Sequence, residues 1–80
     1  MKLEIDEDAN AVYLYLSDAA VAKSKIIEPG VNYDFDANGQ LRGIEVVHAR
    51  SVFGELSDLT AEKMLAMFIV AHTRPAALAA

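Results

Sequence analysis

Residues 34–45 read DFDANGQLRGIE, a segment that is compatible with two different folds. It matches the calcium loop of an EF-hand, because Asp34, Asp36 and Asn38 stand at the first ligand positions, Gly39 at the sharp turn and Glu45 at the bidentate carboxylate. The same residues also match the two strands and the turn of a β-hairpin. The flanking sequence discriminates between these two interpretations.

The flanks favour the hairpin. An EF-hand loop needs a helix on each side. Pro29 and Gly30 stand shortly before the loop and exclude a regular incoming helix, and residues 31–36, VNYDFD, alternate between apolar and polar. After the loop, Ile44 and Val46 are β-branched and prefer a strand. The stretch is therefore predicted to form two antiparallel strands.

The predicted turn is a three-residue loop, Ala37-Asn38-Gly39, with Gly39 in the left-handed region. This loop fixes the register of the two strands. Leu41 and Ile44 differ in parity, so the second strand must also slip by one residue. The predicted pairs are Asp36 with Gln40, Phe35 with Leu41 on the buried face and Asp34 with Arg42 on the exposed face, with a bulge at Gly43 and Ile44 opposite Tyr33.

Three further segments predict strands. Residues 2–6, KLEID, alternate between polar and apolar, residues 11–17, AVYLYLS, are largely apolar on both faces, and residues 23–28, KSKIIE, form a short, weaker strand. Residues 48–56 are compatible with a turn or a short helix. The expected fold is an α+β domain over residues 1–74, with a small antiparallel β-meander of about five short strands and two hairpins. One C-terminal helix should pack on this sheet.

The predicted helix covers residues 57–72, with Ser57, Asp58 or Thr60 as its cap, and Pro75 ends it. Residues 75–80 are expected to fray. From Met64 to Ala71 every residue is apolar, which is more than the single stripe that a surface helix needs. One side should pack on the sheet and the other on a second subunit. The predicted interface residues are Met64, Met67, Phe68 and Ala71, and the predicted assembly is a dimer or a higher homo-oligomer.

Tyr13 and Tyr15 point away from the apolar face of their strand. Two interpretations remain open: they form a recognition surface, or they line a face covered by the helix or by a second subunit. Both interpretations indicate an interface rather than a catalytic site.

Composition excludes several classes of function. The 80 residues contain no cysteine and carry a formal charge of -5, with Lys and Arg scattered, so we expect no thiolate chemistry and no direct binding of nucleic acid. The acidic N-terminus is unlike a signal peptide, and no apolar run is long enough for a bilayer. We expect a cytoplasmic protein without a membrane partner or a cofactor.

The segments AVYLYLS and IIEPGVNYDFDANGQLRGIEVVHARS resemble a small bacterial family, Domain of Unknown Function 2283, over residues 2 to about 52. In Asn38-Gly39 the chain carries an alternative to the usual Asp-Gly of that family's turn. The resemblance implies a β-meander domain without an assigned activity. Some members look like partners of toxin-like proteins encoded beside them, which implies an antitoxin-like role. No functional residues carry over, and the C-terminal helix lies outside the shared region.

Two groups of residues are candidates for chemistry. Asp34, Asp36 and Glu45, with Asn38, form a calcium or hydrolytic site or, as we favour, the solvated face of a hairpin in which Arg42 neutralises Asp34. His48 is predicted to point inward, with Ser51 nearby as a nucleophile; a hydrogen-bonded histidine at a strand end is the favoured alternative.

The expected function is a non-catalytic interaction or regulatory module that acts as a homo-oligomer. An acidic protein suits a basic partner, such as a nucleic-acid-acting toxin. The alternative is a calcium- or metal-binding module that uses residues 34–45. A small hydrolase is the least favoured hypothesis, because the sequence contains no cofactor fingerprint and no nucleophile elbow.

Overall fold

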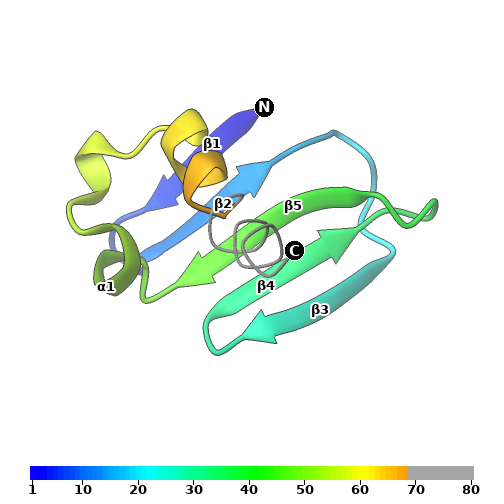
Figure 1. Ribbon diagram of the computed structural model, residues 1–80, viewed down its shortest axis with the longest axis horizontal. Coiled ribbons are helices and arrows are strands. Elements are labelled where there is room, and N and C mark those ends of the chain that lie inside the picture. The colour runs from blue at the N-terminus through cyan, green and yellow to red at the C-terminus, as the bar shows by residue number, and fades with distance from the viewer. Residues whose placement is uncertain (69–80) are drawn as a thin grey trace, which may run out of the picture.

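A computed structural model describes residues 1–68, which form a five-stranded antiparallel sheet with helical segments on one side (Figure 1). This arrangement confirms the α+β class. The strands are β1 (Lys2–Asp6), β2 (Ala11–Tyr15), β3 (Lys23–Glu28), β4 (Val31–Phe35) and β5 (Leu41–Val47). They are followed by helix α1 (Ala49–Phe53), the 3-10 helix η1 (Leu56–Asp58) and a helix that begins at residue 61 and continues to residue 68.

The strand order is β1-β2-β5-β4-β3, so the predicted meander is wrong. Three hairpins form rather than two, and the chain between β2 and β3 crosses to the far edge of the sheet (Figure 1). The physical reason is burial. β2 and β5 carry fully buried residues that pair directly, Val12 with Val46 and Leu14 with Ile44, so these strands take central positions. The polar β3 lies at an edge.

The β4–β5 hairpin confirms the predicted loop. Asp36 N–H donates to the Gln40 carbonyl at 2.9 Å, and Phe35 pairs with Leu41. The slip lies one residue earlier than predicted, because Asp34 pairs with Gly43 and leaves Arg42 as the extra residue. This shift by one position determines which side chains meet on the sheet.

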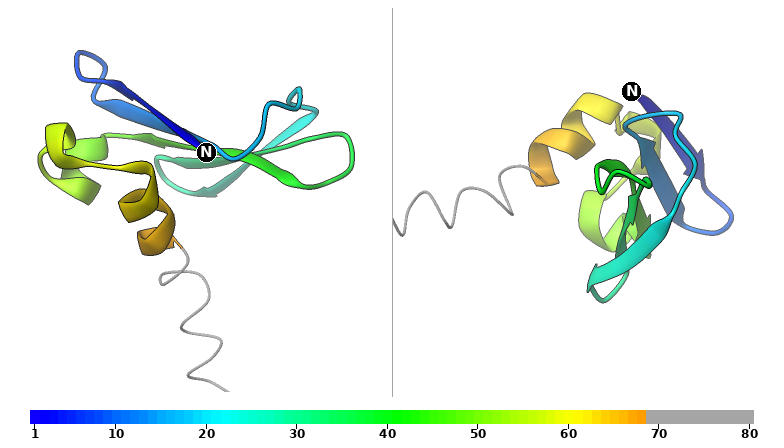
Figure 2. Two further views of the ribbon diagram at one scale, coloured as in Figure 1. Left: turned by 90° about the horizontal axis from the view of Figure 1, so that it is seen from above. Right: turned by 90° about the vertical axis from the view of Figure 1, so that its right-hand side faces the viewer.

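The helical segments of residues 1–68 all lie on the same side of the sheet (Figure 2), and the core lies between them and the strands. Along each strand, every second side chain faces this inner side of the sheet, as the period of two requires. The core consists of Val12, Leu14, Val31, Ile44, Val46, Ala49, Leu56, Met64 and Phe68. Within the described part of the chain, no helix is long and apolar enough to cross a membrane.

The helical region differs from the predicted single helix over residues 57–72. The chain first forms α1 and η1, whose Leu56 is fully buried, and the following helix starts after Thr60. Thr60 is its cap, because its Oγ1 accepts the Lys63 N–H at 3.1 Å. The ambiguity at residues 48–56 is thus resolved as a short helix. The predicted helix end, Ala71 and the tail at residues 75–80 lie outside the described residues.

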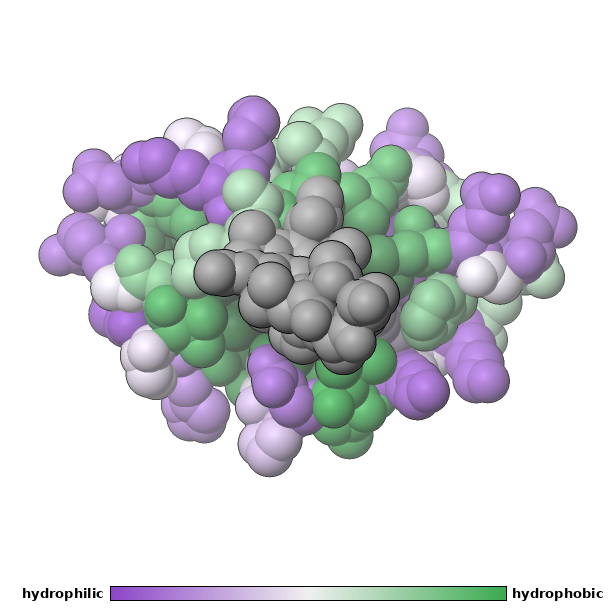
Figure 3. Space-filling view, in the orientation of Figure 1, coloured by the Kyte–Doolittle hydropathy of each residue, from purple (hydrophilic) through white to green (hydrophobic). Residues whose placement is uncertain are grey.

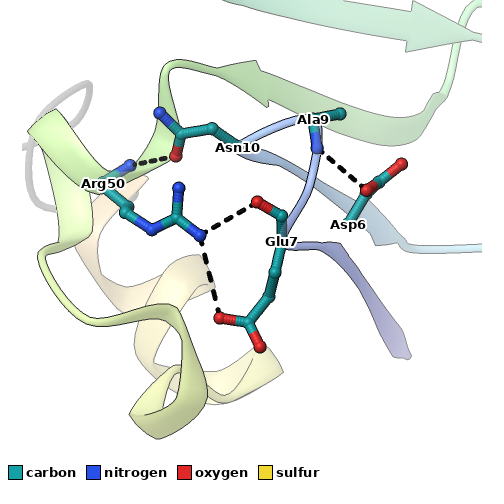
Figure 4. Close-up of polar contacts among 5 residues, drawn as sticks. All are labelled: Asp6, Glu7, Ala9, Asn10 and Arg50. Atoms are coloured by element: carbon teal, nitrogen blue, oxygen red, sulfur yellow. Dashed lines mark hydrogen bonds and ion pairs between the residues drawn. The ribbon is translucent and has the colours of Figure 1, made fainter.

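The β1–β2 turn is fastened to α1 (Figure 4). Asn10, which has a positive φ of 54°, accepts the Ala49 N–H on its carbonyl and the Arg50 N–H on its side-chain Oδ1, both at 2.9 Å. The Arg50 side chain donates to the Glu7 carbonyl at 2.9 Å and lies 3.8 Å from its carboxylate. A residue distant in sequence therefore caps α1, since His48 provides no side-chain cap.

The helix-bearing side of the molecule displays apolar residues beside the grey region (Figure 3). In the helix that starts at residue 61, Met64 and Phe68 are buried, whereas Met67 is 44% exposed. Part of the predicted subunit interface is therefore the chain's own core. Met67 remains available for contact with another molecule.

Candidate functional site

The face of the sheet opposite the helices, hereafter the outer face, is open over the described residues (Figure 2). The strand register arranges its side chains in two rows that cross the strands. We name them by their tyrosines. The Tyr13 row consists of Glu4, Tyr13, Glu45, Asn32 and Ile26, and the Tyr15 row of Lys2, Tyr15, Gly43, Asp34 and Ser24.

A hydrogen-bond network joins the two rows. The Tyr13 hydroxyl donates to Asp34 Oδ2 at 2.6 Å and accepts from Arg42 Nη1 at 2.9 Å. Asp34 Oδ1 accepts from the Ser24 hydroxyl at 2.5 Å and from Asn32 Nδ2 at 3.3 Å. Asp34 is only 9% exposed, and a buried carboxylate requires such donors. The network therefore holds the Tyr13 side chain in place.

The expected pairing of Asp34 with Arg42 on an exposed face is wrong. Asp34 lies on the predicted face of the sheet, but it is buried, and the Tyr13 hydroxyl lies between it and the guanidinium. The cause is the slip at Arg42, which takes this side chain out of the regular alternation.

Gly43 leaves room for the ring of Tyr13. A Cβ atom at position 43 would lie 2.4 Å from both Cε1 and the hydroxyl of Tyr13, well inside van der Waals contact. The bulge places this glycine opposite Asp34 on β4 and Tyr15 on β2. The glycine therefore allows the Tyr13 ring to lie across β5 and reach Asp34.

Arg42 stacks on both tyrosines. Its guanidinium carbon lies 5.5 Å from the centroid of the Tyr13 ring and 4.8 Å from that of Tyr15. Its Nε donates to the Ala19 carbonyl at 2.9 Å, which ties the β2–β3 connection to the outer face. The ring centroids of Tyr13 and Tyr15 are 4.6 Å apart. The two tyrosines and the arginine thus form one packed group.

Burial raises the pKa of Tyr13 above its usual value, and the hydrogen bond to Asp34 raises it further, while Arg42 acts in the opposite direction. Tyr13 is therefore protonated at neutral pH and acts as the donor to Asp34. On the inner face, burial also raises the pKa of Tyr33, with a smaller contribution from Glu28. Neither phenol is poised to act as a base.

Two shallow depressions lie beside this group and share Glu45. The first is lined by Glu4, Asp6, Ala11, Tyr13, Tyr15 and Glu45, and the second by Ile26, Gly30, Val31, Asn32, Glu45 and Val47. The side chains of Glu4 and Glu45 form no hydrogen bond or ion pair with any described residue. Ile26 is 75% exposed and Val47 is 38% exposed. The outer face thus combines free carboxylates, a fixed tyrosine and exposed apolar side chains.

A family model with the description "Protein of unknown function (DUF2283)" matches residues 2–50. The chain belongs to this family. The matched DUF2283 region contains all five described strands and therefore the entire outer face. No curated protein and no solved structure matches the chain.

Within the DUF2283 region, the candidate calcium ligands do not converge. Asp36 Oδ1 accepts the N–H groups of Asn38 and Gln40, at 2.9 and 3.0 Å, and thus stabilises its own turn. Asp34 belongs to the Tyr13 network, and Glu45 lies in the Tyr13 row. Across residues 1–68, no three His, Cys, Asp or Glu side chains form a group that could hold a metal ion.

His48 and Ser51 do not form a nucleophile and base. His48 follows β5 with a positive φ of 53° and is exposed, so its predicted inward orientation is wrong. The Ser51 hydroxyl donates to the His48 carbonyl at 2.8 Å rather than to the imidazole. The strand ends at Val47, and the alternation that predicted an inward histidine ends with it.

The outer face resolves one alternative left open by the sequence. Tyr13 and Tyr15 are half-buried on the face that no described helix covers, so they do not line a helix-covered face. Sequence reasoning missed Ser24, Asn32 and Gly43 as parts of this site. The available signal was Gly43, because a glycine inside a strand often marks a close approach of another group.

Proposed function

We propose that this DUF2283 protein is a non-catalytic binding module that takes a basic protein segment on its outer face. The observation that carries the proposal is the position of Tyr13, which pairs across the sheet with Glu4 on one side and Glu45 on the other. Both carboxylates lack a partner among the described residues. A fixed aromatic side chain between two free negative charges is a suitable anchor for a cationic segment.

Tyr13 is suited to binding because it is already ordered. A side chain that is immobile before binding loses little conformational entropy when a partner arrives. The bonds to Asp34 and Arg42 and the close packing over Gly43 restrict Tyr13 in this way. Tyrosine also offers a broad apolar ring to a lysine stem or a guanidinium.

The partner chemistry follows from the rest of the row. Glu45 lines both shallow depressions, the one that contains Glu4 and Asp6 and the one that contains Ile26 and Val47. A partner that covers both needs Lys or Arg side chains and an apolar side chain next to them. At the usual spacing, the first and the last of five strands lie about 19 Å apart. About six extended residues can span this distance.

The formal charge of -5 supports the same choice of partner, because it attracts cations over a longer range. A basic, nucleic-acid-acting toxin is one type of protein with such segments, and binding it would make this module antitoxin-like.

The proposed module acts as a homo-oligomer, since a domain of this size has a small core and exposes Met67.

Calorimetry with defined peptides tests the binding proposal. The probe is an extended peptide of about six residues with alternating Lys and Ile, compared with a peptide of the same length in which Glu replaces Lys. We expect only the basic peptide to bind, and its affinity should fall as salt is added. Glu45→Lys should weaken binding about tenfold.

The matched control is Glu62→Lys, because Glu62 is an exposed carboxylate on the helix side of the molecule. It changes the net charge by the same amount as Glu45→Lys without altering the outer face. Equal effects of the two substitutions, or binding of the acidic peptide, would show that no specific site exists on the outer face.

A further inference from the structure

Within residues 1–68 the sheet has two edges that no other strand pairs with, and only one of them is regular. β1 and β3 are its outer strands (Figure 1). A free edge presents unpaired backbone N–H and C=O groups to other chains. β3 carries a register shift between Ile26 and Glu28 and two exposed lysines, Lys23 and Lys25, which are features that hinder pairing. β1 pairs with β2 without interruption from Lys2 to Asp6, so its outer edge is straight.

We propose that β1 pairs antiparallel with β1 of a second copy of this chain, with Leu3 on the twofold axis. In this register Lys2 lies opposite Glu4 of the second copy, and the symmetry repeats that pair. Leu3 lies opposite Leu3, and Met1 lies opposite Ile5, all on the helix side of the sheet. Residues that face each other across antiparallel strands are about 5 Å apart, within reach of such contacts.

Charge disfavours the alternative registers. An axis at Glu4 pairs Lys2 with Asp6 but places two glutamates opposite each other, and an axis at Ile5 places Glu4 opposite Asp6. An axis at Lys2 opposes two lysines, and an in-register parallel arrangement opposes every charge with itself. Like charges directly opposite are destabilising. With the axis at Leu3, the charged residues that face each other are Lys2 and Glu4, which have opposite charges. No like charges face each other in this register.

Burial supports the same register. Met1 is 61% exposed, while Leu3 and Ile5 are only partly covered by the core of their own chain. A second copy at this edge would cover all three side chains. The result is a ten-stranded sheet, in which the outer faces of the two copies are continuous.

This inference does not depend on the proposed basic partner. In the dimer, Glu4 would pair with Lys2 of the second copy, so that of the two carboxylates beside Tyr13 only Glu45 would stay free for the basic segment. The two Tyr13 rows would lie on the same face, on either side of the twofold axis. A partner with two basic segments could then bind both copies at once.

Charge reversal tests the register without touching the core. Lys2→Glu and Glu4→Lys each replace two attractive pairs with two repulsive ones in the dimer. Sedimentation equilibrium should show a dimer for the unmodified protein and association weakened about tenfold or more for each variant. An equimolar mixture of the two variants should associate again, because each chain supplies the charge that the other needs.

Native mass spectrometry of the mixture distinguishes the heterodimer by its mass. The matched control is Lys23→Glu on β3, which should leave the dimer intact, and circular dichroism verifies that all variants are folded. A monomeric unmodified protein, single variants that remain dimeric, or a mixture that stays monomeric would each overturn the proposal. These outcomes are independent of peptide binding, which is measured with Glu45→Lys.

Discussion

The hydroxyl of Tyr13 donates a 2.6 Å hydrogen bond to Oδ2 of Asp34, a residue 21 positions away in the sequence. These two side chains come from β2 and β4, which are separated in the sheet by β5. The bond therefore crosses a strand, and it forms over the glycine at position 43. The stability of this arrangement and its consequences for the outer face can be measured.

Tyr13→Phe removes the hydroxyl and leaves Asp34 with one donor fewer. Because Asp34 is buried, we expect the free energy of unfolding to fall by about 1–3 kcal/mol in urea denaturation. Tyr15→Phe is the matched control, since the Tyr15 hydroxyl forms no hydrogen bond with a described residue, and its effect should stay within about 0.5 kcal/mol. Equal effects would argue against the network.

Gly43→Ala should displace the Tyr13 ring, because the added Cβ would lie 2.4 Å from it. We expect a loss of about 1–3 kcal/mol in the free energy of unfolding, the usual range for overpacking. In a Tyr13→Ala background the same substitution should have almost no effect. A double-mutant cycle measures this difference, and additive effects would contradict the proposed contact.

Alkaline pH should destabilise the fold through Tyr13 and Tyr33. Both have a raised pKa in the folded protein, so the folded state holds these protons more tightly than the unfolded state. Their contribution to stability is fully present below the unfolded pKa of about 10 and is lost as the pH rises through the folded pKa values. Urea denaturation across this range measures the loss. In Tyr13→Phe the free energy of unfolding should fall less steeply with rising pH. An unchanged pH dependence would exclude Tyr13 as a source of the alkaline destabilisation.

Asn10 combines a positive φ with a cap for α1, and two substitutions separate these roles. Asn10→Gly adopts the positive φ without strain and removes only the side-chain hydrogen bond to the Arg50 N–H. Asn10→Ala removes the same hydrogen bond and also places a Cβ-bearing residue without a polar side chain at a positive φ. We expect Asn10→Ala to lower the free energy of unfolding by about 1–2 kcal/mol and Asn10→Gly by less. Thermal melting of both variants tests the order, which a purely capping role would not produce.

Met67 and Phe68 are neighbours with different environments. Phe68 is 7% exposed and belongs to the core, so Phe68→Asp should unfold the protein regardless of assembly. Met67→Lys should leave the melting temperature unchanged, because Met67 is 44% exposed. The oligomeric state of the Met67→Lys variant, measured as its molar mass in solution, then tests the helix interface predicted from the sequence. A folded monomer would support that interface, and an unchanged oligomer would leave β1 as the site of self-association.

Elements whose cause is local were predictable from the amino-acid sequence. The turn at Ala37-Asn38-Gly39 fixed the Asp36–Gln40 bond and the Phe35–Leu41 pair, because loop length and a left-handed glycine select one register. Alternation in β1, β2 and β4 likewise assigned the apolar side chains to the inner face. These features need no information from distant parts of the chain.

The sheet order and the site depend on contacts between distant parts of the chain. The β2–β5 pairing joins strands far apart in the sequence, and it depends on which apolar faces are buried together. A bulge displaced by a single residue moved Arg42 away from Asp34 and brought Gly43 beneath Tyr13. A period-two pattern identifies the face that a residue occupies, but not the residue it meets there, because that partner depends on the register of another strand.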